Sequence, residues 1–373
     1  MPVPTDGSRR NELARGGAPC LVLLSAKGKS EIVVRERQKV RQWAAAGAVL
    51  LGLSSSTPSW GQIPGQLTQL PGFDGCIADV GGATCTDGRA LDGPSNSASV
   101  AMSPDGKHLY IASADSDAVA VLRRTKSIGV LAQDPTIDGC VSETGNNGCS
   151  DGTALDSPRG VAVSPDGKHV YVVSDASNAV AAFTRNKSTG ALTQLAGLDR
   201  CISDSGSGGD CADGKALVGA WAVTVSPDGK HIYVASFVST AVAVFARDKN
   251  TGALAQLAGT DGCISNDGSG GTCTDGHALL NPYSVAVSKD GKHVYVTSIS
   301  SDAIAAFARD KGTGVLTQLA NPADCTSEDG SGGTCVDGKA LDGAVALAIS
   351  KDGKHVYVGA TTSGAVAVFA REK

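Results

Sequence analysis

Three residues of types that could hold a ligand stand at one repeated position of the chain. Five residues before the serine of each SPDG or SKDG turn, the sequence has Ala98, Arg159, Trp221, Tyr283 and Val345. An arginine can bind a carboxylate or phosphate with two hydrogen bonds, and aromatic rings can stack on a ring or a sugar. The pattern predicts that Arg159, Trp221 and Tyr283 line a pocket. The alternative is that they plug a narrow channel, as large side chains do in small closed barrels.

An acid–base group is harder to find, because residues 62–373 hold three glutamates: Glu143, Glu328 and Glu372. His277 occupies a position that the other repeats fill with Arg, Thr or Lys. A general base must reach the proton that it removes. If the protein is an enzyme, Arg159 as an anchor and His277 as a base are the catalytic candidates. The alternative for His277 is a variable surface residue on a loop.

Five further histidines recur once per repeat: His108, His169, His231, His293 and His355. Fivefold spacing separates them too widely to share one ion at metal–nitrogen distances of about 2 Å. We therefore expect a solvated or turn-supporting role for them, no metal site and no cofactor. The acidic loops, such as the one with Asp204, Asp210 and Asp213, lack the ligand spacing of known calcium loops.

Ten of the eleven cysteines form local pairs with eight or nine residues between the partners. The pairs are Cys76 with Cys85, Cys140 with Cys149, Cys201 with Cys211, Cys263 with Cys273, and Cys325 with Cys335. One isolated pair per repeat does not supply the four ligands of a zinc site, so the pattern predicts five disulfides in an oxidising compartment.

The elements that must position these residues follow from the repeat itself. The segment SPDGKHxYV and its variants recur every 61 or 62 residues, and each repeat contains four short apolar segments bounded by Gly, Pro, Asp or Ser. Four antiparallel strands per unit, arrayed radially, form a propeller blade. We predict an all-β, five-bladed β-propeller over residues 62–373.

The ends of the repeat region predict how the ring closes. Residues 65–72 resemble a fourth strand without the three that precede it, and the last repeat supplies three strands without a fourth. We therefore expect the N-terminal strand to pair in the C-terminal blade and close the ring without exposed edges.

Residues 1–61 are predicted to be an N-terminal extension and signal peptide that is removed. Basic residues precede the apolar run of residues 43–53, which is too short to span a bilayer comfortably, and small residues follow it. Residues 62–373 carry 23 basic and 33 acidic residues, which argues against nucleic acid as a partner. We expect a secreted, extracellular or periplasmic monomer without membrane insertion after the leader is cleaved.

The repeat VAVSPDGKHVYVxS, with its downstream TGxLTQL, resembles the YVTN-type repeat of the phosphogluconolactonase and carboxymuconate-lactonizing propellers. The resemblance covers about 310 residues and implies the propeller fold. Such enzymes are typically seven-bladed and lack a cysteine-bounded insert in every blade. They tend to place His and Arg at inner-strand entries with a Glu nearby, and Arg159 alone matches such a place.

The sequence favours a secreted module that binds an unknown small ligand, glycan or protein through disulfide-pinned loops on one face. One alternative is an enzyme that hydrolyses or forms small lactones. Another is a structural exoprotein without a ligand.

Overall fold

The computed structural model describes residues 66–79, 84–93, 99–321 and 324–373. The chain divides into two units, residues 1–66 and 67–373, and all the strands of the described residues belong to the second. The predicted signal peptide lies outside the described residues. Among the described residues, no helix has the length and hydropathy needed to cross a bilayer.

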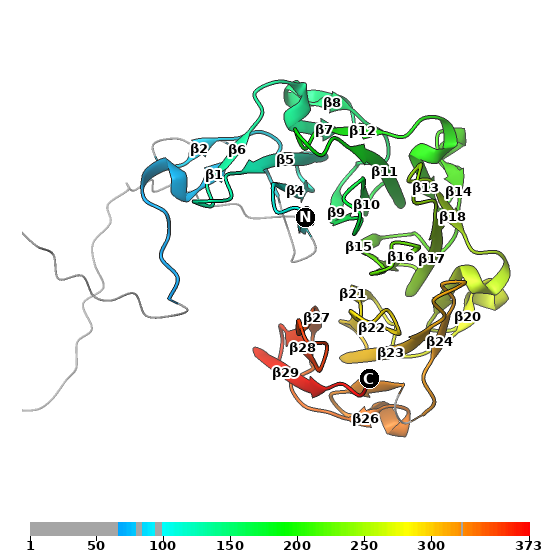
Figure 1. Cartoon of the computed structure of the whole chain (residues 1–373). Helices are drawn as coiled ribbons and strands as arrows, with labels where there is room; N and C mark the ends of the chain where they lie inside the picture. Colours follow the sequence, from blue (N-terminus) through cyan, green and yellow to red (C-terminus); the bar gives the residue numbers. More distant parts are fainter. Residues whose placement is uncertain (1–65, 80–83, 94–98, 322–323) are drawn as a thin grey trace, which may run out of the picture. The chain divides into compact units, whose positions relative to one another are not determined.

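Five sheets of mainly antiparallel strands follow one another in chain order (Figure 1), and each corresponds to one sequence repeat. The first blade contains Val100–Met102 (β3), His108–Ser113 (β4), Ala118–Arg124 (β5), Leu131–Gln133 (β6), Cys140–Ser142 (β7) and Ser150–Asp151 (β8). The second contains Pro158–Val163 (β9), His169–Ser174 (β10), Ala179–Arg185 (β11), Leu192–Gln194 (β12), Cys201–Ser203 (β13) and Ala212–Asp213 (β14).

The third blade contains Ala220–Val225 (β15), His231–Ser236 (β16), Ala241–Arg247 (β17), Leu254–Gln256 (β18), Cys263–Ser265 (β19) and Thr274–Asp275 (β20). The fourth contains Pro282–Val287 (β21), His293–Ser298 (β22), Ala303–Arg309 (β23), Leu316–Gln318 (β24), Cys325–Ser327 (β25) and Val336–Asp337 (β26). The fifth contains Ala344–Ile349 (β27), His355–Ala360 (β28) and Ala365–Ala370 (β29).

Short 3₁₀ turns complete the links between the strands. They are Gly72–Gly75 (η1), Ile137–Gly139 (η3), Asn146–Gly148 (η4), Gly197–Arg200 (η5), Gly206–Gly209 (η6), Gly259–Gly262 (η7), Gly268–Gly271 (η8) and Gly330–Gly333 (η9).

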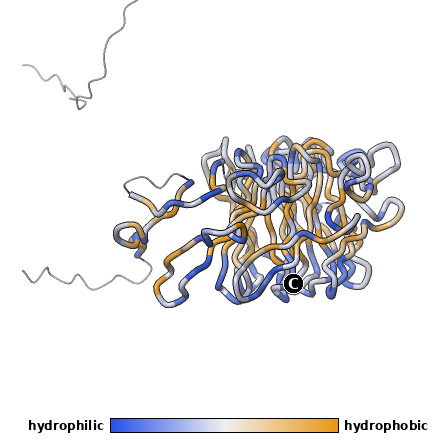
Figure 2. The backbone as a smooth tube through the Cα atoms, turned by 90° about the horizontal axis from the view of Figure 1, so that it is seen from above, coloured by the Kyte–Doolittle hydropathy of each residue, from blue (hydrophilic) through white to orange (hydrophobic). Residues whose placement is uncertain are grey.

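The blades are arranged radially. Their first strands, β3, β9, β15, β21 and β27, contact one another from blade to blade and are therefore innermost. All five line a single cavity of about 500 Å³. The radial arrangement that the repeats predict is thus present. Figure 2 shows apolar strand segments between the more hydrophilic turns at the two ends of the blades.

The SPDG turn joins the first two strands of each blade. In the third blade, Asp228 accepts hydrogen bonds from the Ser226 hydroxyl at 2.6 Å and from the Lys230 amide at 3.1 Å. Gly229 adopts a φ of +71°, which a residue without a Cβ tolerates best. The same side-chain contacts recur in all five blades, which explains why the motif repeats so faithfully.

The predicted cysteine pairing is confirmed in every repeat. The disulfides join Cys76 to Cys85, Cys140 to Cys149, Cys201 to Cys211, Cys263 to Cys273, and Cys325 to Cys335. In each pair the two Cα atoms lie 4.8 or 4.9 Å apart, within the range that a disulfide spans. Each bond therefore closes one short insert within its own repeat.

The cysteine-bounded inserts differ from the predicted loops because they extend the sheets. In the second blade, β13 pairs antiparallel with β11, and β14 pairs parallel with β13. The strand that begins at Cys201 is thus a true member of the sheet. Each of the first four sheets therefore has six strands rather than the predicted four.

The predicted pairing of the N-terminal strand in the last blade is not found. The fifth sheet has three strands, and the described part of the predicted strand, residues 66–71, forms no strand. The next segment, Ile77–Ala78 (β1), pairs only with Thr86–Asp87 (β2). Arg89, which follows β2, donates hydrogen bonds to the carbonyls of Asp134, Thr136 and Gly148 in the first blade. These bonds hold the insert beside the first blade, while β1 remains apart from β29.

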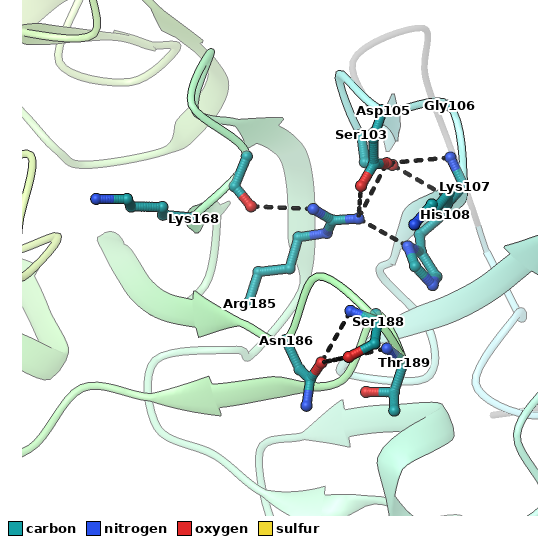
Figure 3. A network of polar contacts seen from close by, with 12 residues as sticks. Ser103, Asp105, Gly106, Lys107, His108, Lys168, Arg185, Asn186, Ser188 and Thr189 are labelled. Atoms are coloured by element: carbon teal, nitrogen blue, oxygen red, sulfur yellow. Dashed lines mark hydrogen bonds and ion pairs between the residues drawn. The ribbon is translucent and has the colours of Figure 1, made fainter.

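Neighbouring blades are joined by a buried polar contact that we call the interblade latch. In Figure 3, the Arg185 guanidinium of the second blade donates to the Asp105 carboxylate at 3.1 Å and contacts His108 Nδ1 at 2.7 Å, both in the first. It also donates to the Tyr110 hydroxyl at 2.7 Å. The same four residue types meet at the three following junctions, through Arg247, Arg309 and Arg371.

Candidate functional site

Arg159, Trp221 and Tyr283 occupy equivalent positions on the innermost strands β9, β15 and β21. Each is the extra residue of a β-bulge, because the pairing with the second strand skips it. A bulge re-aims the side chain that it carries and is common beside functional sites. This variable position of the repeat is therefore also the position at which the backbone leaves regular pairing.

The three side chains touch one another in a continuous stack. The Arg159 guanidinium carbon lies 4.8 Å from the centre of the Trp221 ring, and the Trp221 and Tyr283 ring centres are 5.0 Å apart. Both distances suit cation–π and tilted aromatic contacts. Trp221 Nε1 is buried and has no hydrogen-bond partner among the described residues.

Two more residues belong to this stack and were missed in the sequence. Asp175 lies 3.5 Å from Arg159, and the Phe237 ring centre lies 5.5 Å from that of Trp221. Both directly follow the serine that ends the second strand, where the repeats have Ala114, Asp175, Phe237, Ile299 and Thr361. Comparing the repeats at this second variable position would have found them. We call Arg159, Asp175, Trp221, Phe237 and Tyr283 the mouth cluster.

The mouth cluster combines features of the predicted pocket and of the predicted plug. Its side chains contact one another, as those of a plug would. The cluster is nevertheless accessible: the Arg159 side chain is 21% exposed and that of Asp175 is 31% exposed. Arg159 is also paired with a carboxylate of its own blade, so it is not a bare anion anchor. The arrangement offers aromatic surface beside a donor–acceptor pair.

The cysteine-bounded loops lie away from this cluster. Their strands, such as β19, pair with the third strand of the blade, whereas the cluster lies on the first strand and directly after the second. Glu143 and Glu328 serve these loops, since each accepts a hydrogen bond from a backbone amide, of Leu155 and Leu341 respectively. Burial raises the pKa of Glu143, and the amide bond opposes that shift.

The His277 side chain is 39% exposed, and its Nε2 contacts the Asp324 carboxylate, which is 1% exposed. In the third blade, the equivalent Lys215 instead donates to the carbonyls of Gly259 and Thr272. His277 thus fastens the insert of its blade, as Lys215 does. Cys325 lies beside this pair but is bonded to Cys335, so its sulfur is not a free thiolate for a metal.

Of the two roles expected for the repeated histidines, solvated or turn-supporting, the solvated one does not hold for three of them. His108, His169 and His231 are at most 3% exposed, and each contacts the arginine of the next blade through Nδ1. Burial lowers the pKa of His169, and the Arg247 guanidinium lowers it further. These histidines act as neutral acceptors in the interblade latch.

A family model described as lactonase, 7-bladed beta-propeller, matches residues 74–201 and 151–337. No curated protein matches the chain. A candidate 6-phosphogluconolactonase from Bacteroides uniformis shares 21% identity with a TM-score of 0.49, over 74% of this chain and 66% of its own. The periplasmic gluconolactonase of Pseudomonas aeruginosa shares 19% identity with a TM-score of 0.47, over 73% and 65%. The chain thus spans just under two thirds of the length of either protein.

Proposed function

Because the chain belongs to the lactonase family of seven-bladed β-propellers, we propose that it is a lactonase-like propeller that works as a binding module outside the cytoplasm. The mouth cluster is the proposed binding surface. It carries the proposal because it departs from an otherwise uniform repeat at bulged positions and leaves the buried Trp221 Nε1 without a partner among the described residues. A buried donor of this kind gains free energy when a ligand supplies an acceptor.

The ligand class follows from the chemistry of the cluster. Aromatic edges beside an arginine–aspartate pair suit a ring that bears hydroxyl groups, since hydroxyls both donate and accept. A strongly anionic ligand fits less well, because Asp175 already neutralises Arg159. A neutral or weakly acidic sugar is therefore the proposed ligand, presented free or on a glycan.

The test is a binding measurement against a glycan array and a panel of free sugars. We expect Trp221→Ala to weaken the binding of any ligand found by tenfold or more. The matched control is Val345→Ala, which changes the equivalent position of the fifth blade. Binding that survives Trp221→Ala unchanged, in a protein with unaltered thermal stability, would place the ligand elsewhere.

A lactone hydrolase is the second candidate function, and the Arg159–Asp175 pair favours it. In this second proposal the Asp175 carboxylate takes a proton from the water that attacks the lactone carbonyl, and Arg159 positions Asp175. Lactone turnover that is lost in Asp175→Asn would support an enzyme. If no lactone of a panel is hydrolysed, the enzyme proposal is rejected and the binding module remains the proposed function.

We also propose export and a ring of five blades. Five disulfides suit an oxidising compartment, and the basic and apolar pattern of residues 1–61 suits a removable leader. A mature N-terminus near residue 62, measured by mass spectrometry of the exported protein, would support this. The five innermost strands around one cavity favour five blades over seven.

A further inference from the structure

The interblade latch occurs at the four junctions between adjacent blades. The first and the fifth blade each carry one side of a fifth latch. At each internal junction, an arginine of one blade meets an aspartate, a histidine and a tyrosine of the preceding blade. Arg124 of the first blade is the fifth such arginine, and among the described residues its side chain bonds only the Gly106 carbonyl of its own turn. The fifth blade holds the matching Asp352, His355 and Tyr357, and among the described residues none of these side chains has an arginine partner.

The apolar faces at the two ends are also complementary. Val100 and Met102 of β3 are each 51% exposed. Val161, the equivalent of Val100 in the second blade, is 5% exposed because it packs against the preceding blade. At the other end, Val366 and Val368 of β29 are 63% and 64% exposed. Their equivalents in the third blade, Val242 and Val244, are at most 1% exposed because the fourth blade covers them.

The segment equivalent to the outer strand lies unpaired at one end, and the place for such a strand is empty at the other. Leu67 is 96% exposed, whereas its equivalent Leu316 is 4% exposed and packs in one cluster with Val244 and Ile264 of the preceding blade. The corresponding place in the last blade is a cavity of about 290 Å³. Its lining includes Ile304, Ala306, Thr326, Val356 and Phe369. A leucine side chain at this place would restore the packing of the other blades.

The polar contact of that strand is likewise divided between the two ends. In the fourth blade, the Gln318 side chain accepts from the His277 amide and donates to the His277 carbonyl. The equivalent residues for the last blade are Gln69 and Lys339. Gln69 donates to the Gly75 carbonyl, the same contact that Gln256 makes with the Gly262 carbonyl in the third blade, but among the described residues it has no bond to Lys339.

We propose that residues 67–78 of this chain dock on its own last blade as the outer strand, and that the first blade then packs on the last through an Arg124–Asp352 latch. This inference rests on the proposed ring of five blades and names the contacts that close it. The occupant is the same chain because Val100 of the first blade and Tyr357 and Val366 of the last already line one cavity. Ends held at such a short range in one molecule have a high effective concentration for each other.

The internal blades fix the register of the docked strand. Val242 lies opposite Ile264 between β17 and β19, so Ile77 would lie opposite Val366 between β1 and β29. Directly opposed residues of antiparallel strands have Cβ atoms about 4.5–5.5 Å apart, a separation that a disulfide can bridge with small adjustments.

The test is Ile77→Cys with Val366→Cys in the full-length chain, oxidised and analysed by peptide mapping. Val242→Cys with Ile264→Cys is the matched control for an internal blade. We expect a link between residues 77 and 366 within single chains, on non-reducing gels and by mass. A link between two chains would overturn the proposal in favour of a second copy as the occupant. The absence of any such link, with the control pair linked, would overturn the docking altogether.

A thermal double-mutant cycle covers the case in which the cysteine variants fail to fold. Arg124→Ala and Asp352→Asn should each lower the unfolding midpoint, by about 2–4 °C per disrupted contact, and the double variant should fall by less than the sum. Arg247→Ala with Asp166→Asn is the control cycle at an internal latch. If the midpoint shifts of the Arg124 and Asp352 variants are additive while those of the Arg247 and Asp166 variants are not, the Arg124–Asp352 contact is overturned. Ligand binding that depends on Trp221 is measured separately, so either proposal can fail alone.

Discussion

The Nε of Arg247 donates a 2.7 Å hydrogen bond to the hydroxyl oxygen of Tyr171, which lies 76 residues earlier in the neighbouring blade. The Tyr171 hydroxyl in turn donates to the Gly252 carbonyl at 2.8 Å. Arg247 Nη1 donates to the Gly229 carbonyl at 2.8 Å, and Nη2 to Asp166 at 3.1 Å. One buried guanidinium therefore fixes two blades and two turns relative to each other.

Replacing this arginine should cost a large part of the stability of the blade array. Arg247→Ala leaves the turn carbonyl and the Asp166 carboxylate without their charged donor. Because the Asp166 side chain is about one third exposed, water compensates in part, and we expect a loss of about 2–3 kcal/mol in unfolding free energy. Denaturant unfolding followed by near-UV circular dichroism measures it.

The matched control for that variant is Arg123→Ala, since the Arg123 side chain lies on an exposed position of β5. Surface changes of this kind usually stay within about 0.5 kcal/mol. Equal losses for Arg247→Ala and Arg123→Ala would contradict the role assigned to the latch.

The pH dependence of stability should follow the same groups in two steps. Burial and the neighbouring guanidinium lower the pKa of His169, and likewise of His108, His231 and His293. The folded state therefore takes up their protons less readily than the unfolded state, whose histidines have a pKa of about 6.5. Their contribution is complete above that pH and is lost as the pH falls below it.

The second step comes from the aspartates of the turns. Burial raises the pKa of Asp166 and Asp228, but hydrogen bonds from Ser and Lys and the guanidinium outweigh it and lower each pKa to about 2. Their contribution is present above the unfolded pKa of about 3.9 and is lost as the pH falls toward 2. We expect the thermal midpoint to fall first between pH 7 and 5 and again between pH 4 and 2. A flat profile from pH 7 to 5, or no change of slope in His169→Gln, would contradict the first step.

The blades could be predicted from the repeat, because the same side chains form the turn and the contact to the next blade in each unit. The innermost position of Arg159, Trp221 and Tyr283 followed from comparing repeats, and the structure brings these residues together. Their mutual stacking did not follow, since contact between adjacent blades depends on the bulge at each position. The role of the histidines was missed because their arginine partners lie 77 or 78 residues away in sequence.

The disulfides should stabilise each insert without being needed for the sheet to form. Cys201 and Cys211 close a loop of about ten residues, for which chain entropy gives about 2.7 kcal/mol at most. The Cys201→Ser, Cys211→Ser variant should lose up to that amount, because β13 keeps its pairing with β11. Chemical denaturation of the variant and the parent under oxidising conditions measures the difference. A parent protein that is no more stable than the variant would show that the loop is held by its backbone pairing alone.

His277 and Asp324 provide the last prediction, because two roles for them give opposite results. If the pair fastens the insert, His277→Ala leaves the buried Asp324 carboxylate with the Cys325 amide but without the imidazole, and should cost about 2–3 kcal/mol. The double variant His277→Lys, Asp324→Gly copies Lys215 and Gly262 of the third blade and should recover most of that loss. If the histidine is instead an acid–base group, any lactone turnover should vanish in both variants, whatever their stability. Stability restored in the double variant, with ligand binding intact, assigns the pair to the scaffold, since only a structural contact can be exchanged for that of another blade.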